Sequence, residues 1–322
     1  MNNRNLIKDA LLGVAVGDAL GVPVEFVDRK GLKNEPVTGM RAFGAHHQPI
    51  GTWSDDSSLT FCLAEMLCID YDLKDLATRF VNWKEHAYWT ANNQVFDIGI
   101  ATSSAIYSLQ KGVPPTLAGG SDEDSNGNGS LMRILPLLFF IKDKPIEERF
   151  RITQEVSSLT HRHVRSVIGC FIYLEFALQL IIGKDKWKAY NNMVRDVNDF
   201  LFNNPICSQK EIDIYHRILR NPIGDYEIKP IYEFEEDEIY SSGYVKNTLE
   251  ASLWCLLKTE TYQEAVLKAV NLGHDTDTTG AVTGGLAGLL YGYETIPTEW
   301  LEVLKRKDDI ENLAERMRKK LN

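Results

Sequence analysis

Two short clusters of acidic and hydroxyl residues, far apart in the sequence, have the composition of a metal site. They are Ser54-Asp55-Asp56 and Asp275-Thr276-Asp277-Thr278. Carboxylates two residues apart in an extended turn project to the same side, whereas adjacent carboxylates diverge. Together the clusters could therefore hold two hard cations at once, with the hydroxyls of Ser54 and Thr278 as further oxygen ligands. Such an arrangement is typical of a hydrolase.

The ligand types indicate which metal would bind. His274 adjoins the second cluster, and otherwise neither cluster contains a histidine or a cysteine. An all-oxygen ligand set favours Mg²⁺ or Mn²⁺ over Zn²⁺. We therefore expect two Mg²⁺ or Mn²⁺ ions as cofactors.

Helix capping is the alternative interpretation of the same residues. Ser54 or Asp56 could cap the helix that follows, and Asp277 or Thr278 could cap a helix over Ala281–Tyr291. Either cluster alone favours capping. Taken together they favour a metal site, because three or four carboxylates exceed what two caps need and would repel one another without a cation.

Charge and cysteine content exclude several classes of protein. The net charge of −10 argues against a nucleic-acid surface, so we expect no nucleic-acid partner. The polar N-terminus, Met1 to Asp9, does not resemble a signal peptide. The cysteines are scattered and odd in number, which predicts reduced residues of a cytoplasmic protein. They are Cys62, Cys68, Cys170, Cys207 and Cys255.

Helical periodicity dominates the chain and predicts an all-α fold. Apolar residues recur at helical spacing over Leu59–Leu67, Val245–Leu257 and Tyr262–Val270. Val167–Ile182 is more apolar still, but it is shorter than a bilayer span and is interrupted by charge, so we expect a buried helix and no membrane contact. Strand-like alternation is scarce, and only Val37–Phe43 or Ile228–Phe234 could pair locally. 

The organisation of the chain predicts one domain over residues 1–322, because the two clusters lie near opposite ends and must meet. Two long segments, Arg29–Trp53 and Lys111–Gly129, read as functional loops, and an apolar helix is expected over Leu131–Ile141. The acidic segment at about 221–242 reads as a solvated loop insertion without chemistry.

Several short motifs follow one another in a fixed order along the chain. They are Gly17-Asp18-Ala19-Leu20-Gly21 with Pro23 and Glu25, Ser54-Asp55-Asp56-Ser57, Asp97-Ile98-Gly99, Gly127-Asn128-Gly129-Ser130-Leu131-Met132-Arg133, Thr160-His161-Arg162-His163 and Gly273-His274-Asp275-Thr276-Asp277-Thr278. This ordered set resembles the ADP-ribosylglycohydrolase family, which includes the dinitrogenase reductase-activating glycohydrolase and the ADP-ribosyl-acceptor hydrolases. The likeness runs from about Asn5 to about Gly292. It implies a compact orthogonal helical bundle with a binuclear Mg²⁺ or Mn²⁺ centre in a cleft.

Carried onto this chain, the resemblance implies a ligand set and two further acids. The ligands would be Ser54, Asp55, Asp56, Asp275, Asp277 and Thr278. Glu25 would approach the scissile bond from a loop, although on its own it reads as an exposed loop glutamate. Asp97 would act as an acid, a base or a substrate-orienting group, whereas its local sequence favours capping a helix over Ala101–Leu109. His274 is expected to pack or to form backbone hydrogen bonds rather than to bind metal.

The glycine-rich segment Asn126-Gly127-Asn128-Gly129-Ser130, just before Leu131, resembles an anion-binding loop. Its glycines let free backbone N–H groups approach a phosphate closely. An ordinary turn is its alternative. The family resemblance implies that this segment, one histidine and one tyrosine line an ADP-ribose pocket, while the role of His163 stays open. The predicted contacts are Gly127, Asn128, Gly129, Ser130, Met132, His161 and Tyr244.

The resemblance implies an enzyme that releases ADP-ribose from a modified acceptor, most plausibly arginine on a protein. Asp55 or Asp56 would accept a proton from water, and Glu25 or Asp97 would orient or protonate the leaving group. Serine-linked or small-molecule ADP-ribosyl conjugates are the alternative substrates. A non-catalytic ADP-ribose-binding or immunity protein is the other alternative, and the retained acids argue against a purely structural role.

Overall fold

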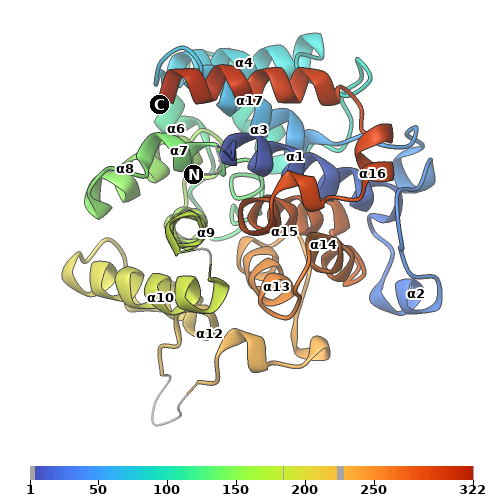
Figure 1. The fold of residues 1–322 in the computed structure, drawn as a ribbon. Helices are drawn as coiled ribbons and strands as arrows, with labels where there is room; N and C mark the ends of the chain where they lie inside the picture. Colours follow the sequence, from blue (N-terminus) through green and yellow to red (C-terminus); the bar gives the residue numbers. More distant parts are fainter. Residues whose placement is uncertain (1–3, 184, 223–227, 322) are drawn as a thin grey trace.

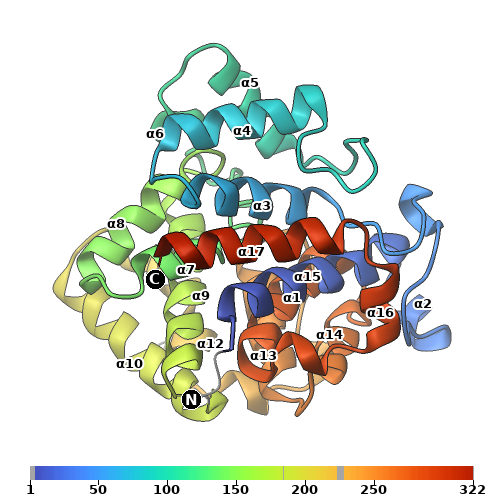
Figure 2. The same ribbon diagram turned by 45° about the horizontal axis from the view of Figure 1, so that its top comes forward.

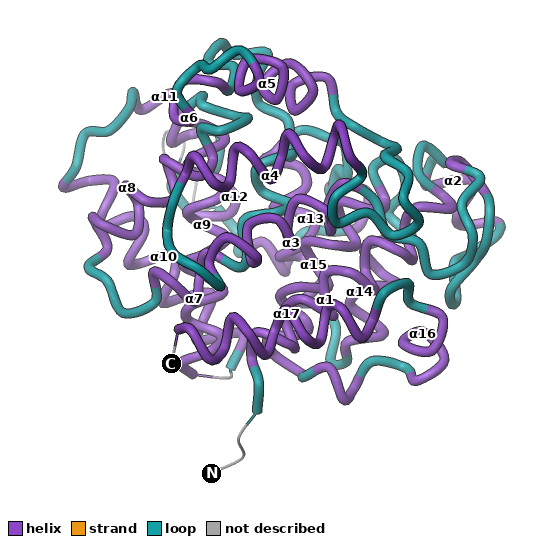
Figure 3. The backbone as a smooth tube through the Cα atoms, turned by 90° about the horizontal axis from the view of Figure 1, so that it is seen from above, coloured by secondary structure: helices purple, strands orange, loops and turns teal. Residues whose placement is uncertain are grey.

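Helices form nearly all of the regular structure. The computed structural model describes residues 4–183, 185–222 and 228–321. Within these ranges the chain has seventeen α-helices, five short 3₁₀ helices and no strand beyond isolated β-bridges (Figure 3). The predicted all-α class is confirmed.

The helices divide into long packing elements and short turns at loop positions. The α-helices are α1 (Leu6–Gly21), α2 (Arg29–Asn34), α3 (Asp55–Leu67), α4 (Leu73–His86), α5 (Ile100–Gln110), α6 (Pro115–Ala118), α7 (Leu137–Ile141), α8 (Ile146–Ser157), α9 (Val164–Gly183), α10 (Lys186–Asn203), α11 (Gln209–Asp213), α12 (His216–Leu219), α13 (Val245–Leu257), α14 (Tyr262–Val270), α15 (Thr276–Tyr291), α16 (Thr298–Val303) and α17 (Lys307–Leu321). The 3₁₀ helices are η1 (Val22–Val24), η2 (Gly44–His46), η3 (Ile231–Glu233), η4 (Glu236–Glu238) and η5 (Tyr293–Thr295).

The central pair of helices, α1 and α15, brings the two ends of the sequence together (Figure 1). Glycines allow their backbones to approach closely. A Cβ atom built on Gly17 would lie 2.1 Å from the carbonyl oxygen of Gly280, and one built on Gly284 would lie 2.2 Å from that of Gly13. A larger residue at these positions would force the helices apart. The second acidic cluster begins α15, and the turn that carries Glu25 follows α1.

Other helices surround this pair on several sides. α13 and α14 pack against α15, while α3 and α17 pack against α1, with α17 lying along α1 and α3 in Figure 2. α9 contacts α8, α10 and α13. One hydrophobic cluster extends through these helices from Ile7 to Met317, so the start of α3 and the start of α15 are held by the same core.

The predicted long helices are confirmed, including the apolar one. α9 has the length and composition of a membrane span, but most of it is buried inside the protein. This burial agrees with the prediction of a core helix.

The apolar helix predicted over Leu131–Ile141 is wrong in its first half. Turns occupy the residues before Pro136, and only α7 is helical. Pro136 sits at the N-cap position of α7 because its ring and missing N–H disfavour the helix interior. 

The two predicted loops are partly helical, since Arg29–Trp53 contains α2 and η2 and Lys111–Gly129 contains α6. The local strand pairing expected for Val37–Phe43 is reduced to a single bridge between Phe43 and Gln48, and Ile228–Phe234 contains η3 instead of a strand.

The acidic segment at 221–242 is solvated only in part. Residues 223–227 lie outside the described residues. Among the others the acidic side chains are exposed or half-buried, while Ile231 and Ile239 are buried. The Arg29 guanidinium donates to the backbone oxygens of Glu236 and Ile239. The segment is therefore anchored to α2 and leads into residues that border the acidic clusters.

Candidate metal centre and active site

The first cluster lies at the start of α3 and is held there by a buried acid of α1. Ser54 is the N-cap of α3, and its Oγ accepts from the Asp56 amide at 3.2 Å, as the capping alternative predicted. Asp18 accepts hydrogen bonds from the amides of Ser54 (2.9 Å) and Ser57 (3.0 Å) and from the Ser57 hydroxyl (2.6 Å). Asp18 therefore fixes the backbone from which Asp55 and Asp56 project.

The second cluster occupies the first turn of α15 and meets the first one. Because α15 begins at Thr276, Asp277 and Thr278 lie inside the helix and not at its cap, so the capping alternative is wrong for them. Thr278 Oγ1 lies 3.4 Å from Asp56 Oδ2, which links residues 222 positions apart. Ser54 Oγ donates to the same carboxylate oxygen at 3.0 Å. Capping by Ser54 and clustering of acids thus coexist.

The carboxylates form two groups that share Asp277. One oxygen from each of Asp18, Asp56 and Asp277 lies within 4.8 Å of the others, and the same holds for Glu25, Asp275 and Asp277. Adjacent carboxylates diverge as expected, since Asp55 lies outside both groups and lines the neighbouring cavity.

Several carboxylate oxygens of this centre lack a partner within the protein. Among the described residues, Asp56 Oδ1, Asp275 Oδ1 and Asp277 Oδ2 are buried and accept no hydrogen bond. Burial and the neighbouring acids raise the pKa values of Asp55, Asp56 and Asp277 well above the usual range. Buried acceptors without donors are costly unless a cation neutralises them. The residues present therefore fit divalent cations.

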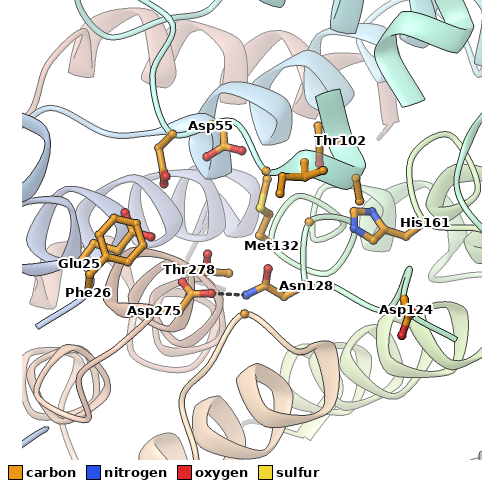
Figure 4. A pocket seen from close by; sticks show the side chains of 17 residues that line it. Glu25, Phe26, Asp55, Thr102, Asp124, Asn128, Met132, His161, Asp275 and Thr278 are labelled. Atoms are coloured by element: carbon orange, nitrogen blue, oxygen red, sulfur yellow. Dashed lines mark hydrogen bonds between the residues drawn. The ribbon is translucent and has the colours of Figure 1, made fainter. Parts of the chain in front are cut away.

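A cavity of about 350 Å³ opens beside the acids. Glu25 and Phe26 form one side, and Thr102 and His161 form the other (Figure 4). The remaining lining residues come from both clusters, from the start of α5 and the residues before it, from the glycine-rich segment and its neighbours, and from the turn before α13. They are Asp55, Asp97, Gly99, Ile100, Ala101, Asp124, Gly127, Asn128, Gly129, Met132, Gly243, Asp275 and Thr278.

Asn128 connects the glycine-rich segment to the second cluster. Its Nδ2 donates to Asp275 Oδ2 at 2.7 Å, drawn as the dashed line in Figure 4, and to Thr248 Oγ1 at 2.9 Å. The Asn128 amide donates to the carbonyl of Gly243 at 3.0 Å. One oxygen of Asp275 is thus oriented by the segment expected to contact phosphate, and its other oxygen remains free.

His161 is a buried, neutral wall of the cavity. Burial and the nearby Arg133 charge lower the pKa of His161 to about 3. The Thr160 hydroxyl lies 2.8 Å from Nδ1, and a Cβ atom on Gly129 would lie 2.7 Å from the ring. Arg133 donates to the Gly129 carbonyl at 2.8 Å, so it holds the same segment from behind. The glycine is needed here because the ring occupies the space of a side chain.

Glu25 and Asp97 lie at the opposite wall. Asp97 does not cap α5, because Gly99 is the N-cap and the backbone of Asp97 is left-handed with φ of 55°. This corrects the capping interpretation of Asp97. The pKa of Glu25 is raised to about 7, mainly by burial; a hydrogen bond from His46 opposes the rise, and the nearby Asp97 and Asp275 carboxylates add to it.

The sequence comparisons agree with this geometry. The profile of the family described as ADP-ribosylglycohydrolase matches residues 1–322. The chain belongs to the ADP-ribosylglycohydrolase family. Members of this family are hydrolytic enzymes, and the resemblance found in the motifs is confirmed.

Two bacterial relatives and one solved structure illustrate the similarity. The ADP-ribosylarginine hydrolase Tri1 of Serratia proteamaculans is 34% identical over 96% of this chain and 78% of that protein. The ADP-ribosyl-[dinitrogen reductase] glycohydrolase of Rhodospirillum rubrum is 27% identical over 92% of this chain and 90% of that protein. A structure titled ADP-ribosylglycohydrolase-related protein complex aligns with a TM-score of 0.77 and 28% identity, covering 99% of this chain and 98% of that one.

For this ADP-ribosylglycohydrolase, most of the predicted site residues lie together. All the predicted ligands and acids gather around the cavity, and so do Gly127, Asn128, Gly129, Met132 and His161. Ser130 and Tyr244 do not line it. The Ser130 hydroxyl is fully buried and contacts Ser157 Oγ at 2.9 Å, and Gly243 lines the cavity next to Tyr244.

His163 and His274 form hydrogen bonds with the backbone. His163 Nδ1 accepts from the Arg165 amide at 3.2 Å near the start of α9, outside the cavity lining. The His274 amide donates to the Val27 carbonyl at 2.8 Å, and the His274 carbonyl accepts from the Phe26 amide at 2.7 Å. The expectation of backbone hydrogen bonds for His274 is confirmed, and these bonds join the Glu25 turn to the second cluster.

Sequence reasoning missed Asp18 and His46. Asp18 lies in the Gly17–Gly21 motif, where an acid flanked by apolar residues on a buried helix was the available signal. His46 lies in the loop Arg29–Trp53 and has no periodic context, so only the folded chain shows its contact with Glu25.

Proposed function

We propose that this protein hydrolyses the bond between ADP-ribose and an arginine side chain of a modified protein, with two divalent cations, Mg²⁺ or Mn²⁺, as cofactors. The observation that carries the proposal is the set of three buried, unpartnered carboxylate oxygens beside a cavity bordered by a glycine-rich segment. Relatives 34% and 33% identical are named ADP-ribosylarginine hydrolase, which supports the arginine acceptor.

The six predicted ligands would hold the cations, with Asp18 fixing the first cluster from behind. When bound, such cations supply Lewis-acid chemistry, orienting the ribose hydroxyls and lowering the pKa of the attacking water. Asp55 faces the cavity and would accept the proton of that water. The surrounding carboxylates would stabilise the positive charge that builds on the sugar ring.

The opposite walls would bind the two ends of the substrate. The backbone of Gly127–Gly129 would receive the diphosphate, since the glycines leave room for a close approach and Asn128 is fixed by the three hydrogen bonds that it donates. Glu25 and Asp97 would face the acceptor, and their negative charge suits a cationic guanidinium. The pKa of Glu25, raised to about 7, suits proton exchange with the leaving group near neutral pH.

The test measures kcat/KM for ADP-ribose release from arginine-linked, serine-linked and small-molecule conjugates in Mn²⁺, with Asp275→Ala as the blank. The proposal predicts that the arginine linkage is favoured by about 100-fold. Preference for serine or a small conjugate would overturn the acceptor assignment. ADP-ribose binding without release from any substrate would instead support a binding or immunity role.

A further inference from the structure

His46 lies against Glu25 and has no part in the reaction described so far. Its Nε2 hydrogen-bonds to Glu25 Oε2, and the same nitrogen lies 3.9 Å from Asp97 Oδ1. The side chains of His46 and Glu25 are only 13% and 8% exposed. The His46 imidazole therefore contacts Glu25 and lies close to Asp97, the two acids expected to face the acceptor.

Aromatic rings hold the imidazole in this orientation. Its centroid lies 5.9 Å from that of Phe26 and 5.2 Å from that of Phe96, and both rings are tilted relative to it. Such tilted arrangements are favourable for aromatic pairs at this separation. Since Phe26 directly follows Glu25 and Phe96 directly precedes Asp97, the ring of His46 packs between the two segments that carry the acids.

The turn that presents His46 is built on the turn that presents Glu25. η2 begins at Gly44, whose φ is +63°, and a Cβ atom there would lie 1.8 Å from the Pro23 carbonyl oxygen. Only glycine permits both this backbone conformation and this approach. The Phe43 amide donates to the Gln48 carbonyl at 2.6 Å and closes the loop. The position of His46 relative to Glu25 is thus fixed by the backbone as well as by the side chains.

The orientation of the Glu25 carboxylate depends on His46. Among the described residues, His46 forms the one side-chain hydrogen bond to the Glu25 carboxylate. Asp97 and Asp275 are among the negative charges that act on it from other segments, and Asp277 belongs to the same group of carboxylates. Without His46 the carboxylate would lose its donor while these repulsive neighbours remained, so it would rotate away from the wall or lose its charge.

We propose that His46 is a positioning residue that holds the Glu25 carboxylate at the acceptor side of the cavity. This positioning role rests on the proposed function, because only the proposed reaction has a leaving group on which the oriented Glu25 carboxylate can act. His46 itself does not line the cavity. Its effect on turnover therefore runs through Glu25.

The first test compares substitutions of His46 that either remove its hydrogen-bond donor or change the position of that donor. His46→Ala should lower kcat by about 10- to 100-fold with KM changed by less than about 3-fold, because orientation is lost and ground-state binding is kept. His46→Gln should recover most of kcat, since its amide nitrogen reaches the place of Nε2, and the shorter His46→Asn should not. The control is His47→Asn at the exposed neighbour, whose φ of 54° asparagine tolerates, and it should leave kcat unchanged.

A double-mutant cycle separates positioning from general disruption. If His46 acts through Glu25, then His46→Ala should have almost no further effect on kcat in a Glu25→Gln background. Additive losses would overturn the proposal. Equal impairment of His46→Ala and His46→Gln would also overturn it.

A structural readout keeps this inference separate from the proposed function. Crystal structures of the wild type and His46→Ala, both loaded with Mn²⁺, should show the Glu25 carboxylate displaced only in the variant. If the wild type releases no ADP-ribose but Glu25 moves, the proposed function fails and the positioning role stands. If the wild type is active and Glu25 stays in place without His46, the positioning role fails alone.

Discussion

Asp56 and Asp277 contribute unpartnered, buried carboxylate oxygens at the point where α3 and α15 meet. In a protein without cations these charges destabilise the fold, and with cations they become ligands. The same two side chains therefore have opposite effects on stability in the two states.

Asp56→Asn should reveal both effects. It should raise the free energy of unfolding of the cation-free protein by about 1–3 kcal/mol, because a buried repulsion is removed. It should lower metal-dependent turnover by at least about 100-fold, because a ligand is lost. Urea unfolding in chelator and ADP-ribose release in Mn²⁺ measure the two quantities.

The control for Asp56→Asn is Asp308→Asn, at an exposed position in the first turn of α17. It should alter stability only slightly and leave turnover at the wild-type level. Unchanged metal-dependent turnover in Asp56→Asn would remove Asp56 from the centre.

Individual site residues were predictable where spacing carried the information. Asp275 and Asp277 are two residues apart and are accompanied by hydroxyl residues that can also bind a hard cation. The cluster could therefore be recognised as a metal site from the sequence alone. Asp18 and His46 act through contacts across 36 and 21 residues. The apolar surroundings of Asp18 marked it as a buried acid, but no local pattern identifies the partner of either residue. Ser130 was misplaced because its position beside a glycine does not say which way its side chain points.

At the scale of elements, the glycine contacts between α1 and α15 set the distance between the Asp18 segment and the second cluster. Gly17→Ala should destabilise the protein by about 1–3 kcal/mol, because the new methyl group would meet the Gly280 carbonyl at 2.1 Å. Mn²⁺ affinity should fall by about 10-fold, since Asp18 and Asp277 would be pushed apart. Thermal unfolding and calorimetric Mn²⁺ titration give both values.

A matched glycine separates packing from helix propensity. Gly183 ends α9, and a Cβ atom there meets nothing within 4 Å. Gly183→Ala should therefore leave Mn²⁺ affinity unchanged and stability unchanged or slightly higher. Equal effects of the two substitutions would contradict the role of the α1–α15 contact.

Long elements were predictable and short ones were not. α13 and α14 match their predicted ranges, because apolar periodicity over several turns identifies a buried face. α2 and α6 are too short to show such a period. Pro136 interrupts the apolar run Leu131–Ile141, which looked like one continuous helix in the sequence. Side-chain composition predicted the glycine-rich segment as a binding loop, but its connection through Asn128 to Asp275 required the fold.

At the scale of the whole molecule, the centre makes stability depend on pH and cations together. Burial raises the pKa values of Asp18 and Glu25 to about 7. The folded, cation-free protein therefore keeps protons that the unfolded chain has already released above about pH 4. Its stability should fall as the pH rises from 5 to 7, by up to about 1.4 kcal/mol per pH unit for each such group.

One group opposes this trend below about pH 6.5. His161, with its pKa lowered to about 3, is neutral when folded and charged when unfolded, so it favours folding as the pH rises. The raised acids outnumber it, so the net slope in chelator should stay negative. Mn²⁺ should reverse the slope, because cations bind the deprotonated acids. Urea unfolding between pH 5 and 7.5 with chelator or Mn²⁺ checks this, and stability that rises with pH in chelator would contradict it.

The measurement that tests the central claim most directly is the release of ADP-ribose from an arginine-linked ADP-ribosylated protein, followed while the bound Mn²⁺ is titrated from zero. Release should be absent in chelator and should reach its maximum as the second cation binds, and Asp275→Ala should show none at any concentration. Release that persists in chelator, or that does not change in Asp275→Ala, would contradict the assignment of the two acidic clusters as the catalytic metal centre.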